Sequence, residues 1–237
     1  MRGMWSLRRL ASIPLAVAAL SPDVSAGPSG RPAVRVGIVL GGRVPDVARH
    51  VPAMLSEANA IWRPRGVVLA LVDEKESAPG DLRLTLTFAP IAGAPSQIAP
   101  RPGGRASEGR PGLGSIWFYE DGKPGDAIAL DPRAIRVRLS EVRINGRPIE
   151  DWPPSVVDQA MGRALGRVLA HELGHYLLSS TAHAMSGLMR AAFNGPELAG
   201  WDRGRFVLDA GAIPRLQARL ARLESARDPL VAGNPSR

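Results

Sequence analysis

The chain has 237 residues, of which 45% are hydrophobic, and its formal net charge is +8. This composition suits one ordinary domain with its own core and argues against a fibrous or membrane-spanning protein. The absence of cysteine excludes a disulfide framework, thiolate metal sites and cysteine nucleophiles. The basic residues are scattered along the chain rather than clustered with aromatic residues, so we expect no nucleic-acid partner.

Residues 1–26 have the pattern of a signal peptide. Basic residues precede an apolar run from Leu10 to Leu20, and this run is too short to cross a bilayer. Small residues before Ala26 are typical of a cleavage site. We therefore expect a secreted or periplasmic protein without stable membrane insertion after cleavage.

The first half of the remaining chain alternates strand and helix patterns. Residues 33–40 are β-rich and apolar, residues 44–66 have apolar residues at helical spacing, and residues 67–74 and 81–88 are again typical of strands. Residues 89–114 are so rich in proline and glycine that they predict a long surface loop. The predicted order is strand, helix, strand, strand, loop.

Short strands are predicted next, at residues 115–120, 127–130 and 135–139. Apolar residues at helical spacing predict a C-terminal helix before a frayed end; they are Ile213, Leu216, Leu220 and Leu223. Residues 27–227 therefore form one predicted domain, and residues 228–237 form a flexible tail.

A long buried helix is predicted between these segments. We expect it to start near Ser155, with Asp158 three residues later as a weak capping box. An apolar stripe then recurs at spacings of three and four and runs into His171 and His175. Both histidines are thus expected to face the core.

The histidines carry the chemistry of the sequence. Three of the four histidines, His171, His175 and His183, fall within thirteen positions. Positions i and i+4 of a helix share a face, so His171 and His175 can bind one ion while Glu172 lies beside them. This H-E-x-x-H pattern indicates zinc, with Glu172 as the general base that takes a proton from water.

These residues resemble the metzincin clan of zinc metallopeptidases, and within it the matrixin-type enzymes. The match covers His171, Glu172, Gly174 and His175, with Met189 as the Met-turn methionine. The resemblance implies a zinc-dependent endopeptidase that hydrolyses peptide bonds. It also implies an α+β fold in which a mixed twisted sheet is joined by an N-terminal helix, the zinc-binding helix and a C-terminal helix.

The third ligand departs from the family pattern. Leu178 stands where the family has glycine, and Thr181 stands where it has the third histidine. His183 is our candidate ligand, two residues further on, and a helix continuing through Ser179 and Ser180 would suit that shift. The rival is a thermolysin-like arrangement in which Glu197 is the third ligand.

The resemblance also implies that a protein or peptide substrate lies along an edge strand, for which residues 115–120 are the candidate. His50 is expected on a helix surface and Met185 in a loop, both outside the site. Two further interpretations remain, a catalytically silent zinc-binding module on the same scaffold and a zinc-storage or structural protein. Neither of them needs Glu172.

Overall fold

The structure, a computed structural model, describes residues 34–42, 46–73, 82–91 and 112–227. The predicted signal peptide (1–26), the tail (228–237) and most of the predicted loop (89–114) lie outside the described residues. In the part that is described, no helix has the length and apolar character needed to span a membrane.

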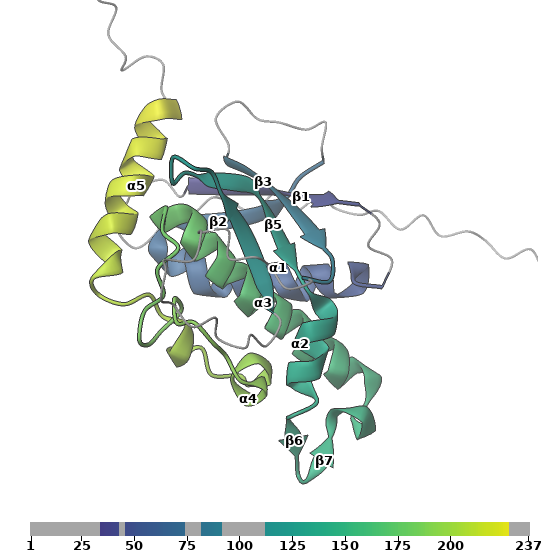
Figure 1. The fold of residues 1–237 in the computed structure, drawn as a ribbon. Helices are drawn as coiled ribbons and strands as arrows, with labels where there is room; N and C mark the ends of the chain where they lie inside the picture. Colours follow the sequence, from purple (N-terminus) through teal and green to yellow (C-terminus); the bar gives the residue numbers. More distant parts are fainter. Residues whose placement is uncertain (1–33, 43–45, 74–81, 92–111, 228–237) are drawn as a thin grey trace, which may run out of the picture.

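A five-stranded mixed sheet forms one layer of the molecule (Figure 1). The strand order is β2-β1-β3-β5-β4; β1, β2, β3 and β5 run parallel, and β4 pairs with β5 in the antiparallel direction. The bounds are β1 Val34–Gly41, β2 Val67–Leu71, β3 Leu82–Phe88, β4 Gly114–Phe118 and β5 Pro124–Leu130. The predicted strand at residues 115–120 is thus largely β4, the outer strand on one side of this sheet.

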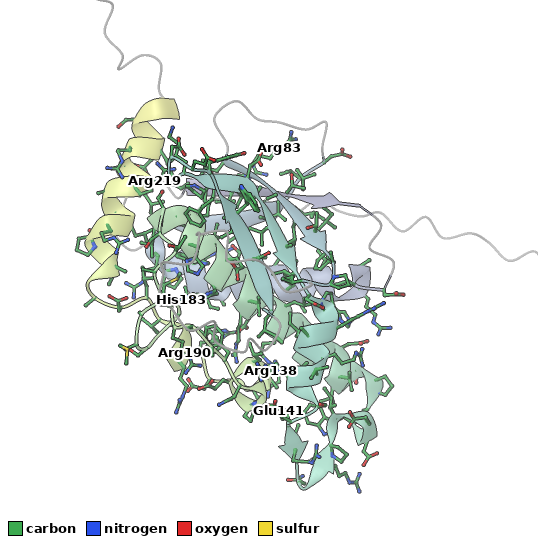
Figure 2. The ribbon with its side chains drawn as sticks, viewed as in Figure 1. Arg83, Arg138, Glu141, His183, Arg190 and Arg219 are labelled. Atoms are coloured by element: carbon green, nitrogen blue, oxygen red, sulfur yellow. The ribbon has the colours of Figure 1, made fainter. Side chains whose placement is uncertain are left out.

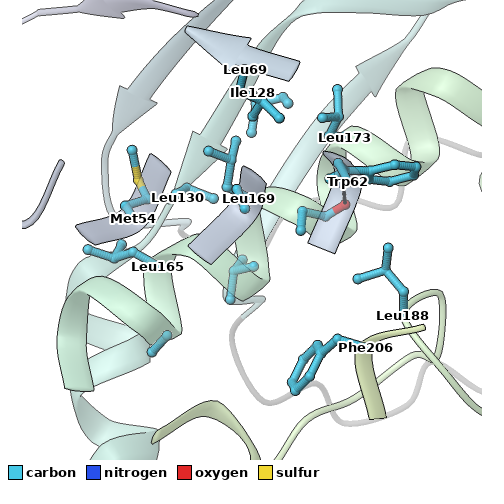
Figure 3. Close-up of a cluster of buried hydrophobic side chains, with 14 of the residues drawn as sticks. Met54, Trp62, Leu69, Ile128, Leu130, Leu165, Leu169, Leu173, Leu188 and Phe206 are labelled. Atoms are coloured by element: carbon cyan, nitrogen blue, oxygen red, sulfur yellow. Dashed lines mark hydrogen bonds between the residues drawn. The ribbon is translucent and has the colours of Figure 1, made fainter. Parts of the chain in front are cut away.

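Two helices pack against each other and against the sheet. Helix α1 (Val51–Trp62) contacts β2, and helix α3 (Pro154–Leu178) contacts β4 and β5. Trp62 at the end of α1 is fully buried, and its indole N–H donates to the carbonyl of Ala170 in α3 at 3.0 Å. Leu165, Leu169 and Leu173 of α3 lie in one buried cluster with side chains of α1 and the sheet (Figure 3). The C-terminal helix α5 (Ala212–Arg227) packs on α3 and is present as predicted.

The remaining elements are short. They are η1 Ala48–His50, η2 Arg63–Arg65, α2 Pro132–Leu139, β6 Arg143–Ile144, β7 Arg147–Pro148, η3 Ile149–Asp151, α4 Gly195–Ala199 and η4 Gly204–Phe206. Helix α4 follows α3 in the chain and packs against it.

The strand predicted at residues 135–139 is wrong, because these residues belong to helix α2. Asp131 caps the helix, with its carboxylate accepting from the backbone N–H groups of Arg133 and Ala134. Ile135 and Leu139 are one helical turn apart and both are buried. Over five residues, this i, i+4 pair also fits an alternating strand, and the cap decides in favour of the helix.

Two local predictions also fail. His50 is only 2% exposed, not on the surface, because it ends η1 where that turn packs against α3. Helix α3 begins at Pro154, and no side chain caps it; Asp158 instead forms an ion pair with Arg49. A proline at the first helical position needs no N–H partner, so the predicted capping box is not required. Met185 is an exposed loop residue, as predicted.

Candidate metal centre

The C-terminal half of α3 places His171, Glu172 and His175 in the interior. All three side chains are buried, because this part of the helix lies between the sheet and the segment that follows it. The helix ends at Leu178, and Ser179 takes a left-handed conformation (φ 46°). The predicted extension through Ser180 is therefore wrong: the backbone N–H of Ser180 bonds back to the carbonyl of His175 at 3.2 Å, which turns the chain sharply.

Backbone carbonyls fix the orientation of both buried imidazoles. Nδ1 of His171 lies 2.8 Å from the carbonyl oxygen of Leu188, and Nδ1 of His175 lies 2.6 Å from that of Ser180. Because a carbonyl oxygen only accepts hydrogen bonds, each Nδ1 carries the proton. Each neutral ring therefore keeps a lone pair on Nε2.

These two lone pairs face each other. Nε2 of His171 and Nε2 of His175 are 3.1 Å apart, and neither atom has a proton to donate when Nδ1 is protonated. Two buried lone pairs at this distance repel each other unless both of them bind a cation. The pair is thus arranged for a ligand that accepts electrons from both rings.

His183 supplies the third donor. Its ring centroid lies 4.9 Å from that of His175 and 5.4 Å from that of His171, and the candidate ligand atoms of all three histidines lie within 4.8 Å of one another. Figure 2 shows His183 on the segment that follows α3. The structure therefore brings together the three histidines singled out in the sequence.

The donor set fits a zinc ion. Tetrahedral coordination with Zn–N bonds of about 2.0–2.1 Å requires nitrogen atoms roughly 3.3 Å apart, close to the 3.1 Å between the two Nε2 atoms of α3. Three imidazole ligands leave a fourth position for water or substrate, as in a catalytic zinc site. The His–carbonyl bonds are the outer contacts that usually orient such ligands.

The electrostatics keep the rings neutral. Burial lowers the pKa of His171 to about 4, although the Leu188 carbonyl acts in the opposite direction. Burial also lowers the pKa values of His175 and His183 below the ordinary histidine value. Because only the neutral ring can bind a metal, all three side chains are ready to act as ligands at neutral pH.

A tight turn brings Met189 against helix α3. Gly187 has φ 76°, which glycine adopts without strain. The backbone N–H of Ala184 donates to the carbonyl of Met189 at 2.8 Å and closes the turn. The sulfur of Met189 lies against Gly174, at a position that a β-carbon on residue 174 would fill. Gly174 therefore leaves the space that this sulfur occupies.

Glu172 lies next to the start of the edge strand. A β-carbon on Gly114, the first residue of β4, would lie 2.8 Å from Glu172 Oε1 and 2.7 Å from a methyl group of Val168. The missing side chain at residue 114 therefore makes room for the carboxylate. Burial raises the pKa of Glu172 to about 8, so the group can both accept and release a proton near neutral pH.

Glu197, the rival third ligand, is engaged elsewhere. Its carboxylate contacts Arg190 at 2.5 Å and Arg205 at 3.0 Å. It also accepts the backbone N–H of Asn194 in a capping box at the start of α4. Glu197 is not part of the group in which the histidine nitrogens converge.

Several parts of the site have no signature that the sequence analysis used. Backbone carbonyls of Ser180 and Leu188 hold the histidines, and no residue type identifies such a role. Phe193 presents its ring to the edge of His171 at 5.5 Å between centroids, and one aromatic residue in a loop is not diagnostic.

Solved structures that resemble this chain include archaemetzincin (amzA) from Methanopyrus kandleri, with 15% identity and a TM-score of 0.43 over 80% of this chain and 97% of that chain. A zinc-dependent peptidase from Methanocorpusculum labreanum (strain Z) has 15% identity and a TM-score of 0.41 over 76% of this chain and 99% of that chain. No family model and no curated protein matches the chain. These similarities are too low to assign a function, which must come from the geometry of the site.

Proposed function

We propose that the protein is a zinc-dependent metallopeptidase of the metzincin type, in which His171, His175 and His183 hold the ion. The observation that carries this proposal is the pair of buried Nε2 atoms that face each other at 3.1 Å. Their Nδ1 protons are used by backbone carbonyls, so a cation is the partner that this geometry lacks. Zinc suits three neutral imidazoles better than magnesium or calcium, which prefer oxygen ligands.

A bound zinc ion would polarise the substrate carbonyl and lower the pKa of water. Glu172 then acts as the general base: its carboxylate takes a proton from the attacking water and delivers it to the leaving amine. A cation held by the adjacent histidines favours the ionised form of Glu172, which burial alone disfavours. The sheet and α3 exclude bulk water from the carboxylate.

The substrate would be an extended segment of a protein or peptide chain paired with β4. This strand forms one side of the sheet among the described residues, and its first residue, Gly114, lies next to Glu172. Backbone pairing with an edge strand gives affinity without a requirement for one sequence. A strand that binds the middle of a chain favours endopeptidase activity over removal of terminal residues.

We further propose that the enzyme is matrixin-like and that Met189 is its Met-turn methionine. Its support is the turn at Gly187 and the contact of the Met189 sulfur with Gly174. We also propose that the enzyme acts outside the cytoplasm, in a secreted or periplasmic location. That part rests on the sequence pattern of residues 1–26, which lie outside the described structure.

The proposal is tested by cleavage of an unstructured protein such as casein, with zinc content measured in parallel. Wild-type protein should cleave the substrate, and Glu172→Ala should lose about a thousandfold or more in rate while retaining zinc. A wild-type protein that binds zinc without cleaving any substrate would favour the silent module. Cleavage unchanged by Glu172→Ala would exclude the assigned general base.

A further inference from the structure

Arg167 is a buried charge in the middle of the helix that carries the histidines. Its side chain is 0% exposed and lies one helical turn before His171. The Nε group of Arg167 donates at 2.8 Å to Oε1 of Glu57 in α1, which is itself only 4% exposed. Burying such a pair is costly, and an apolar pair of similar volume often gives equal stability. The arginine therefore calls for an explanation other than stability alone.

The rest of the guanidinium holds the chain around α4. Arg167 donates from Nη1 to the carbonyl of Glu197, with a longer contact of 3.4 Å to that of Leu198, and from Nη2 to the carbonyl of Asp202 at 3.1 Å. Arg203 completes the cluster by donating to Oε2 of Glu57 at 2.7 Å. One buried side chain thus ties α1, α3 and residues 197–202 together.

Aromatic rings continue from this cluster back to the metal site. The guanidinium of Arg167 lies 4.5 Å over the ring of Phe206. Phe206 stacks on Phe193 at 5.1 Å, and Phe193 meets the edge of His171 at 5.5 Å. We call residues 193–206 the clamped segment. Its two phenylalanines link Arg167 to His171, which lies one helical turn later on α3.

We propose that Arg167 is a positioning residue for the metal site, which holds the clamped segment so that Phe193 supports the ring of His171. The inference rests on the proposed function, since it assumes that His171 binds zinc. The mechanism is packing: Phe193 restricts the imidazole in the orientation that its bond to Leu188 also requires. If the clamped segment were free to move, the imidazole of His171 could rotate, and zinc binding would be weaker.

A double-mutant cycle tests the link. Zinc affinity is measured by competition with a chromophoric chelator for the wild type, Arg167→Met, Phe193→Leu and the double variant. Each single change should weaken zinc binding about tenfold, and the double variant should be weakened about tenfold as well, because both changes break one line of contacts. Losses that multiply to about a hundredfold, or single variants with wild-type affinity, would overturn the inference.

Arg163 is the matched control. It lies one turn before Arg167 on the same helix and also contacts the clamped segment, because it donates to the carbonyl of Ala199 at 2.8 Å and covers the ring of the exposed Trp201. Among the described residues, however, Arg163 does not contact Phe206, whose ring stacks on Phe193. Arg163→Met should change zinc affinity less than about twofold, and its effect should be additive with that of Phe193→Leu. Non-additivity of the same size as for Arg167 would show a general loosening and contradict a specific role.

Arg167→Met leaves Oε1 of Glu57 without its buried partner, and if this variant fails to fold, Phe206→Leu carries the test because it leaves the ion pair intact. It should reproduce the tenfold loss and the non-additivity with Phe193→Leu, whereas wild-type affinity would overturn the inference. A wild-type protein that fails to bind zinc contradicts the proposed function itself. A wild-type protein that binds zinc, with additive variants, contradicts only the role of Arg167.

Discussion

Helix α3 and the segment that follows it, residues 179–190, contribute to the same site in different ways. The helix brings His171, Glu172 and His175 together through its own periodicity. The segment contributes His183, the carbonyl of Leu188 and the contact of Met189 through a series of turns. Regular structure makes the first set readable from spacing, whereas the second set depends on individual backbone conformations and on contacts with distant residues. Each contribution can be perturbed separately.

The largest effect is expected at the third ligand, which comes from the segment. His183→Ala should weaken zinc binding by about a thousandfold, or about 4 kcal/mol, because two histidines alone hold the ion poorly against water. Glu197→Ala is the matched variant and should change zinc affinity little, since Arg190 and Arg205 engage that carboxylate. Zinc titrations of both variants measure this; loss of zinc from Glu197→Ala alone would favour the thermolysin-like arrangement.

The second effect is a pH dependence of stability that comes from Glu172 in α3 and is measured in metal-free protein. Burial raises the pKa of Glu172 to about 8 from 4.5. The folded protein therefore loses stability as pH rises from about 4.5 to 8, because over this range the unfolded chain releases the proton that the buried carboxyl keeps. Glu172→Gln removes that penalty. In chelator-treated protein, the variant should gain about 3 kcal/mol relative to wild type between pH 5 and pH 8.

Urea unfolding of the two metal-free proteins at both pH values measures the gain. A difference that does not change with pH would show that Glu172 stays ionised in the folded protein, with a pKa near its ordinary value.

A third effect concerns the turn at Gly187, between His183 and Met189. Gly187 and Gly122 both have φ 76°, but only at residue 187 would a β-carbon meet another group, the carbonyl oxygen of Val207. Gly187→Ala should cost about 2 kcal/mol or more, and Gly122→Ala about 1 kcal/mol from backbone strain alone. Only Gly187→Ala should also weaken zinc binding, because Leu188 and Met189 follow it directly.

Urea unfolding and zinc titration of these two variants separate strain from the effect on the site. Equal losses in both variants, with unchanged zinc affinity, would mean that the turn does not support the histidines.

The smallest expected effect lies on the edge strand. Trp117 in β4 is 51% exposed, and a substrate residue paired opposite it would pack on the indole. Trp117→Ala should raise KM about fivefold, about 1 kcal/mol, and leave kcat unchanged. Trp201→Ala is the control, because Trp201 is also exposed but follows helix α4 and is not part of β4. Equal KM values for Trp117→Ala and wild type would place the substrate elsewhere.

Most of the sheet and the large helices could be predicted because each carries enough residues for its period to be distinct. Residues 135–139 could not, because five residues with buried Ile135 and Leu139 satisfy two periods, and the deciding cap is the preceding Asp131. The burial of His50 depends on the packing of η1 against α3, which no local pattern records.

In the site, too, the residues at regular helical spacing could be predicted, whereas the backbone turns and the contacts with distant residues could not. The spacing of His171 and His175 fixes their shared face, and the structure places His183 beside them. The turn at Ser179 could not be predicted, because serine rarely adopts positive φ; here the backbone N–H groups of Ser179 and Ser180 donate to the last carbonyls of the helix. Sequence patterns also did not identify the carbonyls that hold the imidazoles or the path from Arg167 through Phe193.

We claim that the facing Nε2 atoms of His171 and His175 share a zinc ion with His183. The most direct measurement is the metal content of protein purified without chelators, by mass spectrometry of the elements, for wild type and His175→Ala. We expect about one zinc ion per wild-type chain and almost none in the variant. Wild-type protein without zinc, or a variant that keeps its full zinc content, would contradict the claim.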